Sequence, residues 1–332
     1  MRSKIIATGR YIPERLVTNE DLSNMFDTSD EWIKDRTGIE QRYYIKDEMG
    51  ASDMAFNACE NVFNEGIVKR EDIDFIIFAT LSPDHTFPGS GCFLQGKLGL
   101  ADVPSMDIRN QCTGFLYSLR MGDLLIKSGD YKRVLIAGAE VHSTGLDFSN
   151  NGRDVTVLFG DGAGVVVLGP CEDNEGGFLS FALHSDGTHA KDLWLDCPGS
   201  RYTPSRINKT MIDEGRHFPK MNGRRVFSHA VKKMPEVLME ALESSGTDLK
   251  ELDLIVPHQA NKRINEKFAE MLGISFGKVY SNIERYGNTT AASIPIALDE
   301  LRRQGRLKKG DMIGLVAFGS GFTWAASIVK WV

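Results

Sequence analysis

Short apolar runs rich in β-branched residues alternate with stretches of mixed polarity along most of the chain. Such runs, bounded by polar or glycine-containing turns, are typical of strands buried between the layers of an α/β fold. The predicted strands cover residues 75–80, 133–139, 156–169, 252–257 and 312–319. The segment after Cys112 predicts a helix that ends at Gly129 and is apolar around much of its circumference. We therefore expect this helix to be buried centrally.

An internal repeat appears when residues 70–112 are laid over residues 249–288. In both segments a polar stretch precedes a hydrophobic strand, and a helix that ends in Leu-Gly leads to a second strand and a turn into a helix. The overlay brings Cys112 close to Asn288, one residue out of register. We expect a duplicated fold in which the turns of the two halves face one centre.

Length and composition bound the class of protein. The 332 residues are 42% hydrophobic, enough to bury a large core in two compact halves or one large α/β domain. Five cysteines without a CxxC pair argue against a disulfide framework or zinc site and favour the reducing cytosol. No apolar segment is long enough for a signal peptide or a membrane span. A net charge of −6 with scattered basic residues gives no support for a nucleic-acid partner.

Cys112 lies between a predicted strand and a predicted helix. A free cysteine is usually a buried structural residue. At a helix N-terminus, however, unpaired backbone N–H groups and the helix dipole favour the thiolate and lower the thiol pKa. Cys92 has a similar glycine-rich approach and is the rival nucleophile. The cysteines interpreted as structural are Cys59, Cys171 and Cys197.

Three later segments carry groups that suit thioester chemistry. His258 follows a predicted strand, and strand ends in α/β folds collect functional residues. Asn288 follows a glycine at a predicted helix start, where it is either a functional amide or a plain N-cap. The glycine-containing segment 317–327 either presents backbone N–H groups to an oxyanion or is a bulged strand. His85 is the next histidine candidate, and those assigned to loop or helix surface are His142, His184, His189, His217 and His229.

The chain order Cys, His, Asn with a glycine-rich backbone donor fits two reaction classes. In a cysteine hydrolase of the papain kind, the histidine activates the thiol and the asparagine orients the histidine. In an acyl transferase that forms carbon–carbon bonds, histidine and asparagine donate hydrogen bonds to a thioester oxygen as negative charge develops. The papain-type surroundings of the cysteine are absent here, and that class has no use for the repeat.

Several longer motifs resemble those of β-ketoacyl-acyl-carrier-protein synthase III, a family of condensing enzymes in the thiolase superfamily. The resemblance runs nearly end to end, and the motifs occur in family order. They are TSDEWIKDRTGI (28–39), TFPGSGCFLQGKLG (86–99), CTGFLYSL (112–119), LFGDGAGVVVL (158–168), LHSDG (183–187), VPHQANKRI (256–264), RYGNTTAASIPIALDE (285–300) and AFGSGFTWAAS (317–327).

The resemblance implies a thiolase-like, five-layered αβαβα fold of the α/β class with two duplicated halves, residues 1–172 and 173–332, in a homodimer. It implies that Cys112 takes an acyl group from acyl-coenzyme A. Malonyl-acyl-carrier protein would then lose carbon dioxide, and His258 and Asn288 would stabilise the enolate, which attacks the acyl thioester. This reaction initiates fatty acid synthesis.

The resemblance also distinguishes this chain from related enzymes. Thiolases use a second cysteine late in the chain, and none follows Cys197. Ketoacyl synthases of the elongating classes have a second histidine where Asn288 lies, so the asparagine favours the initiating class. Backbone N–H groups of Cys112 and Ser320 would form the oxyanion hole. No metal or redox cofactor is required, and acyl-coenzyme A is a substrate.

Further residues are implied in binding. Asn261 would contact the pantetheine arm, and Phe87 would reach the acyl pocket of the partner subunit. The set implied for coenzyme A, by stacking and charge, is Thr28, Trp32, Arg36 and Arg153. The basic area implied for the acidic carrier protein consists of Arg224, Arg225, Lys262 and Arg263. Without the resemblance, the same residues would be a surface tryptophan with paired arginines and a solvated charged face.

Three departures from the family pattern concern the substrate. Polar residues 109–111 precede the cysteine where small apolar residues are more familiar, and Ser320 replaces a glycine. A long segment, 190–222, within the turn-rich excursion 185–223, is expected to reshape the acyl tunnel or its entrance. These three departures leave open which acyl primer is used and whether the acceptor is carried by the carrier protein or by coenzyme A. The alternatives are a condensing enzyme of specialised lipid or ketide synthesis, a Cys-His hydrolase and a non-enzymatic scaffold.

Overall fold

Two mixed β-sheets form the framework of this computed structural model, which describes residues 2–332. The first sheet has the order β1-β7-β6-β4-β5 and the second the order β8-β13-β12-β11. The strands of the first are β1 (Arg2–Tyr11), β4 (Phe75–Ala79), β5 (Ser105–Ile108), β6 (Val134–Glu140) and β7 (Gly162–Cys171). Those of the second are β8 (Gly177–Ser185), β11 (Leu254–Pro257), β12 (Met312–Gly319) and β13 (Thr323–Lys330). The division drawn at residues 172/173 falls between β7 and β8.

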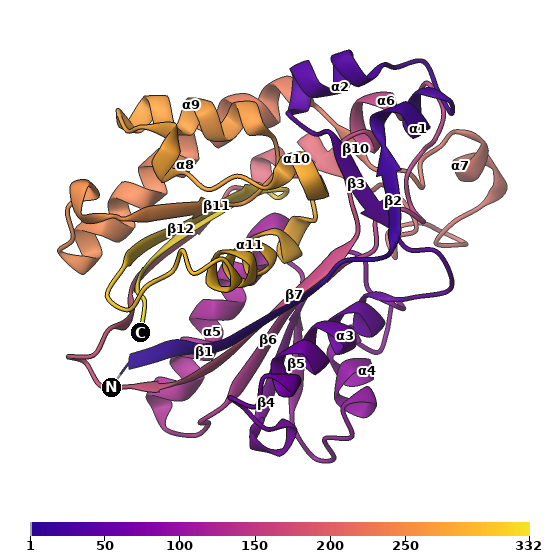
Figure 1. The fold of residues 1–332 in the computed structure, drawn as a ribbon. Helices are drawn as coiled ribbons and strands as arrows, with labels where there is room; N and C mark the ends of the chain where they lie inside the picture. Colours follow the sequence, from indigo (N-terminus) through magenta and orange to yellow (C-terminus); the bar gives the residue numbers. More distant parts are fainter. Residues whose placement is uncertain (1) are drawn as a thin grey trace.

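Helices cover the outer face of each sheet and fill the space between the sheets (Figure 1). The outer helices of the first sheet are α3 (Ala51–Asn64) and α4 (Ser90–Lys97). The central layer consists of α5 (Gly114–Ser128) and α11 (Ser293–Arg303). The outer helices of the second sheet are α8 (Gly223–Ser245) and α9 (Lys262–Leu272). These five layers confirm the expected αβαβα architecture, and α5 is central, as its apolar pattern predicts.

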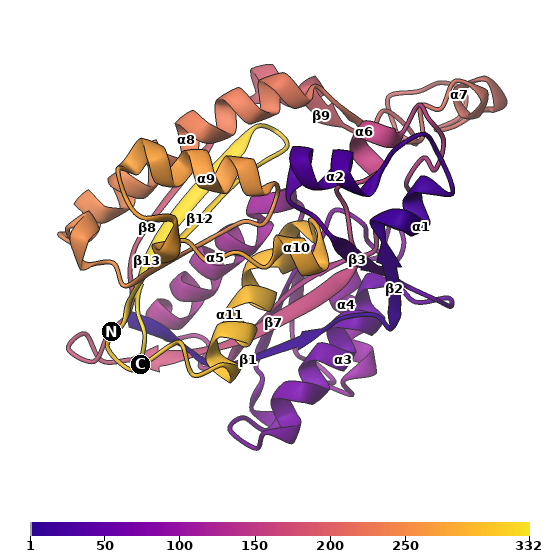
Figure 2. The same ribbon diagram turned by 45° about the horizontal axis from the view of Figure 1, so that its top comes forward.

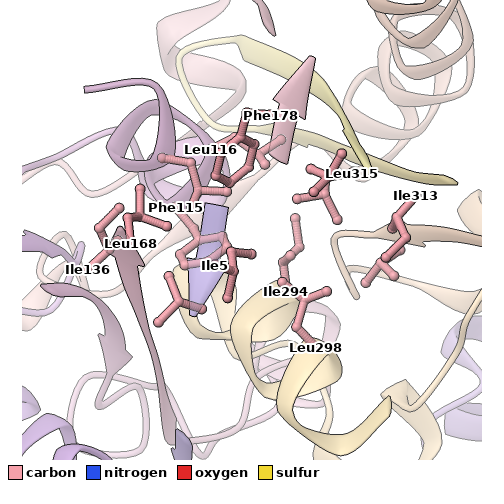
Figure 3. Packing of buried hydrophobic residues seen from close by; sticks show 14 of the residues in the cluster. Ile5, Phe115, Leu116, Ile136, Leu168, Phe178, Ile294, Leu298, Ile313 and Leu315 are labelled. Atoms are coloured by element: carbon pink, nitrogen blue, oxygen red, sulfur yellow. The ribbon is translucent and has the colours of Figure 1, made fainter. Parts of the chain in front are cut away.

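The main hydrophobic core lies in the central layer and joins the two halves (Figure 3). Side chains from α5 and α11 meet apolar residues of both sheets there, so neither half can be removed without exposing this surface to water. Its labelled members are Ile5, Phe115, Leu116, Ile136, Leu168, Phe178, Ile294, Leu298, Ile313 and Leu315.

The remaining elements lie at one end of the layers. Strands β2 and β3 pair antiparallel, with two short helices between them in the chain, and α7 projects from the body together with its flanking loops (Figure 2). Their bounds are β2 (Arg15–Thr18), α1 (Asn19–Ser23), α2 (Asp30–Thr37), β3 (Gln41–Tyr44), α6 (Arg153–Thr156), β9 (Leu193–Trp194), α7 (Lys209–Asp213), β10 (Lys220–Met221) and α10 (Ile283–Tyr286). Within residues 2–332, no helix has the length and apolar character that crossing a bilayer requires.

The predicted duplication is confirmed by the topology. Strands β4-β6-β7-β1 correspond in order and direction to β11-β12-β13-β8, since the first pair of each set is parallel and the next two pairs are antiparallel. The turn η2 (Gln111–Thr113) precedes α5 as η6 (Thr290–Ala292) precedes α11. Gln111 and Thr290, the first residues of these turns, both have positive φ angles, 44° and 49°. The structural counterpart of Cys112 is therefore Ala291 and not Asn288, and the sequence overlay was out of register by more than one residue.

Each turn packs against a glycine on a strand of the other half. A Cβ atom added at Gly319 of β12 would lie 2.6 Å from the Cβ of Cys112. A Cβ atom at Gly138 of β6 would lie 2.5 Å from the carbonyl oxygen of Ala291. Both distances are far inside van der Waals contact, so these two glycines allow each half to bring its turn against the strand of the other.

The prediction of a strand over residues 156–169 is partly wrong. Thr156, the first residue of the predicted strand, is the last residue of α6, and β7 begins only at Gly162. The Asp161 carboxylate explains the irregular segment between them, because it accepts the backbone N–H groups of Ile45 at 2.8 Å and His142 at 2.6 Å. These bonds tie residue 161 to the segments at 45 and 142, just before the ladder of β7 begins.

We predict that Gly138→Ala destabilises the fold. The added methyl group meets a backbone carbonyl that cannot rotate away, so the loss of unfolding free energy should be about 1 to 3 kcal/mol. Thermal or denaturant unfolding measures it. Gly96→Ala in α4 is the matched control, since a Cβ there has no atom within 4 Å. The control should be neutral or stabilising by up to about 1 kcal/mol, and equal losses in the two variants would contradict the account.

Candidate active site

Cys112, His258 and Asn288 line one cavity of about 1260 Å³. Cys112 lies in η2 of the first half, whereas His258 follows β11 and Asn288 precedes η6 in the second. The cavity therefore exists only where the two halves meet. Cys92 and His85, the rival nucleophile and histidine, are exposed and lie outside its lining.

The thiol of Cys112 is buried against β12. The pKa of the thiol is raised to about 12, because burial and then the Glu140 carboxylate raise it by more than the N–H groups of Ser320 and of Cys112 itself lower it. The expectation of a lowered thiol pKa is wrong for the free protein, because desolvation outweighs the hydrogen bonds at the turn. The two N–H groups that face the sulfur could also donate to the oxygen of an acyl group attached to it.

His258 is held as a neutral donor. Its Nδ1 lies 2.7 Å from the Oγ of Ser293, which also accepts the N–H of Gln259 at 3.4 Å. No other acceptor for the Ser293 hydroxyl lies within the described residues, so we assign its proton to the bond with Nδ1 and the ring proton to Nε2. Burial lowers the pKa of His258 to about 3. Nε2 is buried and has no hydrogen-bond partner among the described residues, so it is available to a ligand.

Asn288 is held by its backbone and by one side-chain atom. Its N–H donates to the carbonyl of Leu158 at 2.8 Å, and its carbonyl accepts the N–H of Gly160 at 3.1 Å. The side-chain Oδ1 accepts the N–H of Thr290 at 2.9 Å. This bond fixes the orientation of the amide and leaves Nδ2 as a hydrogen-bond donor. Because Asn288 does not bond to His258, it cannot orient the imidazole as the asparagine of a papain-type hydrolase does.

Ser320 satisfies the backbone requirement for an oxyanion-binding N–H. The φ of Ser320 is not in the positive range, whereas the next residue, Gly321, has a φ of 137°. The Oγ of Ser320 donates to the carbonyl of Leu193 in β9. The long excursion therefore reaches the turn between β12 and β13, and it supplies one wall of the cavity. Its lining residues are Leu193, Trp194, Leu195, Pro198, His217, Pro219 and Met221.

Two arginines flank a tryptophan at the cavity entrance. The guanidinium of Arg36 lies 5.5 Å from the centre of the Trp32 ring, and that of Arg153 lies 5.0 Å from it. Trp32 and Arg36 line the cavity. Asn261 lines it as well, but it also caps α9 through Oδ1 and donates from Nδ2 to the carbonyl of Arg36 at 3.0 Å. Thr28 lies outside the lining.

The four basic residues predicted to dock a carrier protein differ in their surroundings. Arg224 and Arg263 are exposed, line the cavity and form no ion pair within residues 2–332. Arg225 pairs with Asp192 at 3.3 Å. Lys262 is partly covered, because its side chain packs under Gly38. The entrance thus carries two unpaired arginines.

Two family models match the chain. That of 3-oxoacyl-[acyl-carrier-protein] synthase III matches residues 106–187, and that of its C-terminal part matches residues 242–331. A β-ketoacyl-[acyl-carrier-protein] synthase III of Caldanaerobacter subterraneus is 42% identical over 98% of this chain and 97% of that protein. One of Clostridium acetobutylicum is 43% identical over 99% of this chain and 98% of that protein. The chain belongs to the β-ketoacyl-[acyl-carrier-protein] synthase III family.

Solved structures of synthase III share the fold. The enzyme of Aquifex aeolicus gives a TM-score of 0.90 at 41% identity and covers 99% of this chain and 100% of that chain. The enzyme of Thermus thermophilus gives a TM-score of 0.91 at 40% identity, with 99% of both chains covered. The chain is accordingly a condensing acyltransferase with the thiolase-like fold of synthase III.

His142 is the residue of this synthase III site that sequence reasoning missed. It was assigned to a surface segment, but it is buried and lines the cavity beside Thr290. The sequence gave only a weak signal, since His142 lies three residues after the predicted strand 133–139, whereas His258 follows its predicted strand directly. His217 also lines the cavity, and no periodic pattern marked it, because it lies in the irregular excursion.

We expect the reactivity of the Cys112 thiol to report its raised pKa. Alkylation by iodoacetamide should accelerate about tenfold per pH unit from about pH 6 to about pH 9, because only the thiolate reacts. The Cys112→Ala variant corrects for the other cysteines. A plateau that begins below about pH 8 would instead show that the positive end of α5 outweighs burial.

Proposed function

We propose that this chain condenses an acyl-coenzyme A primer with malonyl-acyl-carrier protein and so initiates fatty acid synthesis. One observation carries the proposal: in the cavity that holds Cys112, His258 Nε2 is buried without a partner within residues 2–332, and the amide of Asn288 is bonded there through Oδ1, which leaves Nδ2 as a second neutral donor. Two donors without a strong base suit a reaction that makes a carbanion by losing carbon dioxide rather than by removing a proton.

Acyl transfer is the first step of this proposal. The sulfur of Cys112 attacks the thioester carbon, and the N–H groups of Cys112 and Ser320 stabilise the oxyanion of the tetrahedral intermediate. The bond to the coenzyme sulfur then breaks, and the proton of Cys112 leaves on the coenzyme A thiol. The raised thiol pKa makes a transient thiolate strongly nucleophilic in the desolvated cavity.

Decarboxylation and condensation follow. The bond from the malonyl carbon to its carboxylate breaks, carbon dioxide leaves, and the electron pair forms an enolate whose oxygen accepts hydrogen bonds from His258 and Asn288. The enolate carbon attacks the acyl thioester on Cys112, and the sulfur is expelled as the new carbon–carbon bond forms. The product is a 3-oxoacyl group on the carrier protein.

The binding residues support the two substrates named here. Trp32 with Arg36 and Arg153 offers a stacking face and positive charge to the nucleotide end of coenzyme A. Unpaired Arg224 and Arg263 at the entrance suit an acidic carrier protein or a phosphate. We propose no bound cofactor and a cytoplasmic location, which suits five free cysteines.

A homodimer belongs to the same proposal. Within residues 2–332, strand β5 pairs with β4 alone and leaves its other edge open, and open edges invite pairing with another chain. Phe87 is 76% exposed and lies outside its own cavity, which suits a side chain inserted into the acyl pocket of a partner subunit.

A second candidate is priming of specialised ketide synthesis. The priming β-ketosynthase of the R1128 polyketide pathway gives a TM-score of 0.88 at 29% identity, with 99% of this chain and 96% of that chain covered. The cavity wall formed by the excursion, with Trp194 and Leu195, favours this candidate because it determines which primers fit.

Labelled acetyl-coenzyme A followed by malonyl-carrier protein tests the function. We expect label on Cys112 by intact mass, and then release of carbon dioxide and a 3-oxoacyl product. Cys112→Ala should accept no label, and His258→Ala should be acylated but slow condensation at least about 100-fold. Free acetate with untouched malonyl-carrier protein would support a hydrolase. Acylation only by other primers from a graded panel would support the second candidate.

Charge reversal at the entrance tests carrier-protein docking. Arg224→Glu with Arg263→Glu should raise the KM for malonyl-carrier protein about tenfold by replacing attraction with repulsion. The KM for malonyl-pantetheine, which lacks the protein, should stay unchanged. Lys309→Glu, an exposed charge distant from the cavity lining, is the control. An equal rise of KM for both malonyl substrates would show that the arginines bind the pantetheine arm instead.

A further inference from the structure

His142 is a buried histidine in the cavity that the proposed reaction does not use. It is the second residue after β6, and its Nε2 is 2.8 Å from the Oγ1 of Thr290. Burial and the neighbouring His258 lower the pKa of His142 to about 3, so the imidazole is neutral and this bond persists at working pH. A buried polar ring with one specific partner on the opposite half requires an explanation.

Thr290 connects this histidine to Asn288. A φ of 49° is unusual for a β-branched residue and persists only where the surroundings hold it. In this conformation the N–H of Thr290 points to Asn288 Oδ1 at 2.9 Å. The Thr290 hydroxyl is bonded to His142. Thr290 therefore links the histidine, through its hydroxyl, to the asparagine, through its N–H.

His142 is itself held rigidly. Its N–H donates to Asp161 Oδ1 at 2.6 Å, and its ring packs on Phe159 with a centroid distance of 4.4 Å. Phe159 also forms a parallel bridge with Asn288. Phe159 thus contacts both the histidine and the asparagine. The imidazole is held in a fixed position, from which it bonds to Thr290.

The other half contains a related contact at its own turn. The Oγ1 of Thr113, next to Cys112, donates to the Oγ1 of Thr323 at 2.8 Å. This contact differs in position from that of His142, because Thr113 is the last residue of η2 whereas Thr290 is the first of η6, and Thr323 begins β13, the counterpart of β7. Both turns are nevertheless tied to the other half by a threonine hydroxyl.

We propose that His142 is a positioning residue, which acts through the hydroxyl and N–H of Thr290 to keep the Nδ2 of Asn288 directed at the enolate oxygen. The inference rests on the proposed function, because Asn288 has a role only in decarboxylation. If Thr290 relaxes, the amide of Asn288 is free to rotate and to present Oδ1, whose lone pairs repel an enolate. One of two donors is then lost, and loss of a single such donor typically costs about 100-fold or more.

The two half-reactions separate this role from a merely structural one. His142→Leu and Thr290→Val, which keeps the shape of the side chain, should lower the rate of decarboxylation and condensation about 10- to 100-fold. The rate of Cys112 acylation should stay within about twofold, because that step uses other donors. Ser327→Ala removes a buried hydrogen bond in β13, from Ser327 Oγ to the carbonyl of Ser180 at 2.8 Å, and should alter neither rate.

A double-mutant cycle identifies the route of the effect. In the Asn288→Ala background, His142→Leu should produce no further loss, because the group that it positions is absent. His142→Gln, which restores a polar atom for Thr290, should recover part of the rate. Losses that add in the double variant, or that fall equally on acylation and condensation, would overturn the proposal.

A readout without turnover keeps this test independent of the proposed function. With ¹⁵N-asparagine labelling, the side-chain amide signal of Asn288 is assigned by its loss in Asn288→Ala. It should shift in His142→Leu and in Thr290→Val and stay fixed in Ser327→Ala. An unchanged signal in the first two variants would overturn the positioning role. A wild-type protein that acylates Cys112 without condensing would overturn the proposed function instead, whatever the amide signal shows.

Discussion

The contact of two backbone turns with two glycines is the constraint on which the cavity depends. At Gly319, the turn that carries Cys112 meets a strand of the second half, and at Gly138, the turn after Asn288 meets a strand of the first. No side chain fits between these backbones, so Cys112 and the backbone N–H of Ser320, which follows β12 directly, come together in the lining of one cavity. The duplicated sheets and the shared core of α5 and α11 keep this alignment.

Within that cavity, each functional side chain has one polar atom bonded to protein and another left for a ligand. His258 uses Nδ1 on Ser293, and Asn288 uses Oδ1 on the N–H of Thr290. Both side chains are buried and neutral, and in a water-poor site such fixed dipoles act strongly on a developing negative charge. A charged base would be costly to bury there. The same physical chemistry that excludes a strong base therefore favours loss of carbon dioxide as the source of the carbanion.

The sequence supported the layered fold, the duplication and the residues of the cavity, because strand patterns and glycines are local signals and the motifs occur in family order. It could not give the register of the repeat, since equivalence of Cys112 with Ala291 depends on backbone shape at two turns with positive φ. It gave the wrong direction for the thiol pKa, because burial is a tertiary property. His142 was missed for a related reason: its partner, Thr290, lies 148 residues away along the chain.

The central claim is that one cavity holds an acyl oxygen and an enolate oxygen at separate sets of donors. A crystal structure of the acyl enzyme with a malonyl thioester analogue that cannot decarboxylate measures this directly. The account predicts the acyl oxygen at the N–H groups of Cys112 and Ser320, and the analogue's thioester oxygen within hydrogen-bond distance of His258 Nε2 and Asn288 Nδ2. An analogue oxygen bound elsewhere, with His258 contacting only the sulfur of Cys112, would contradict it.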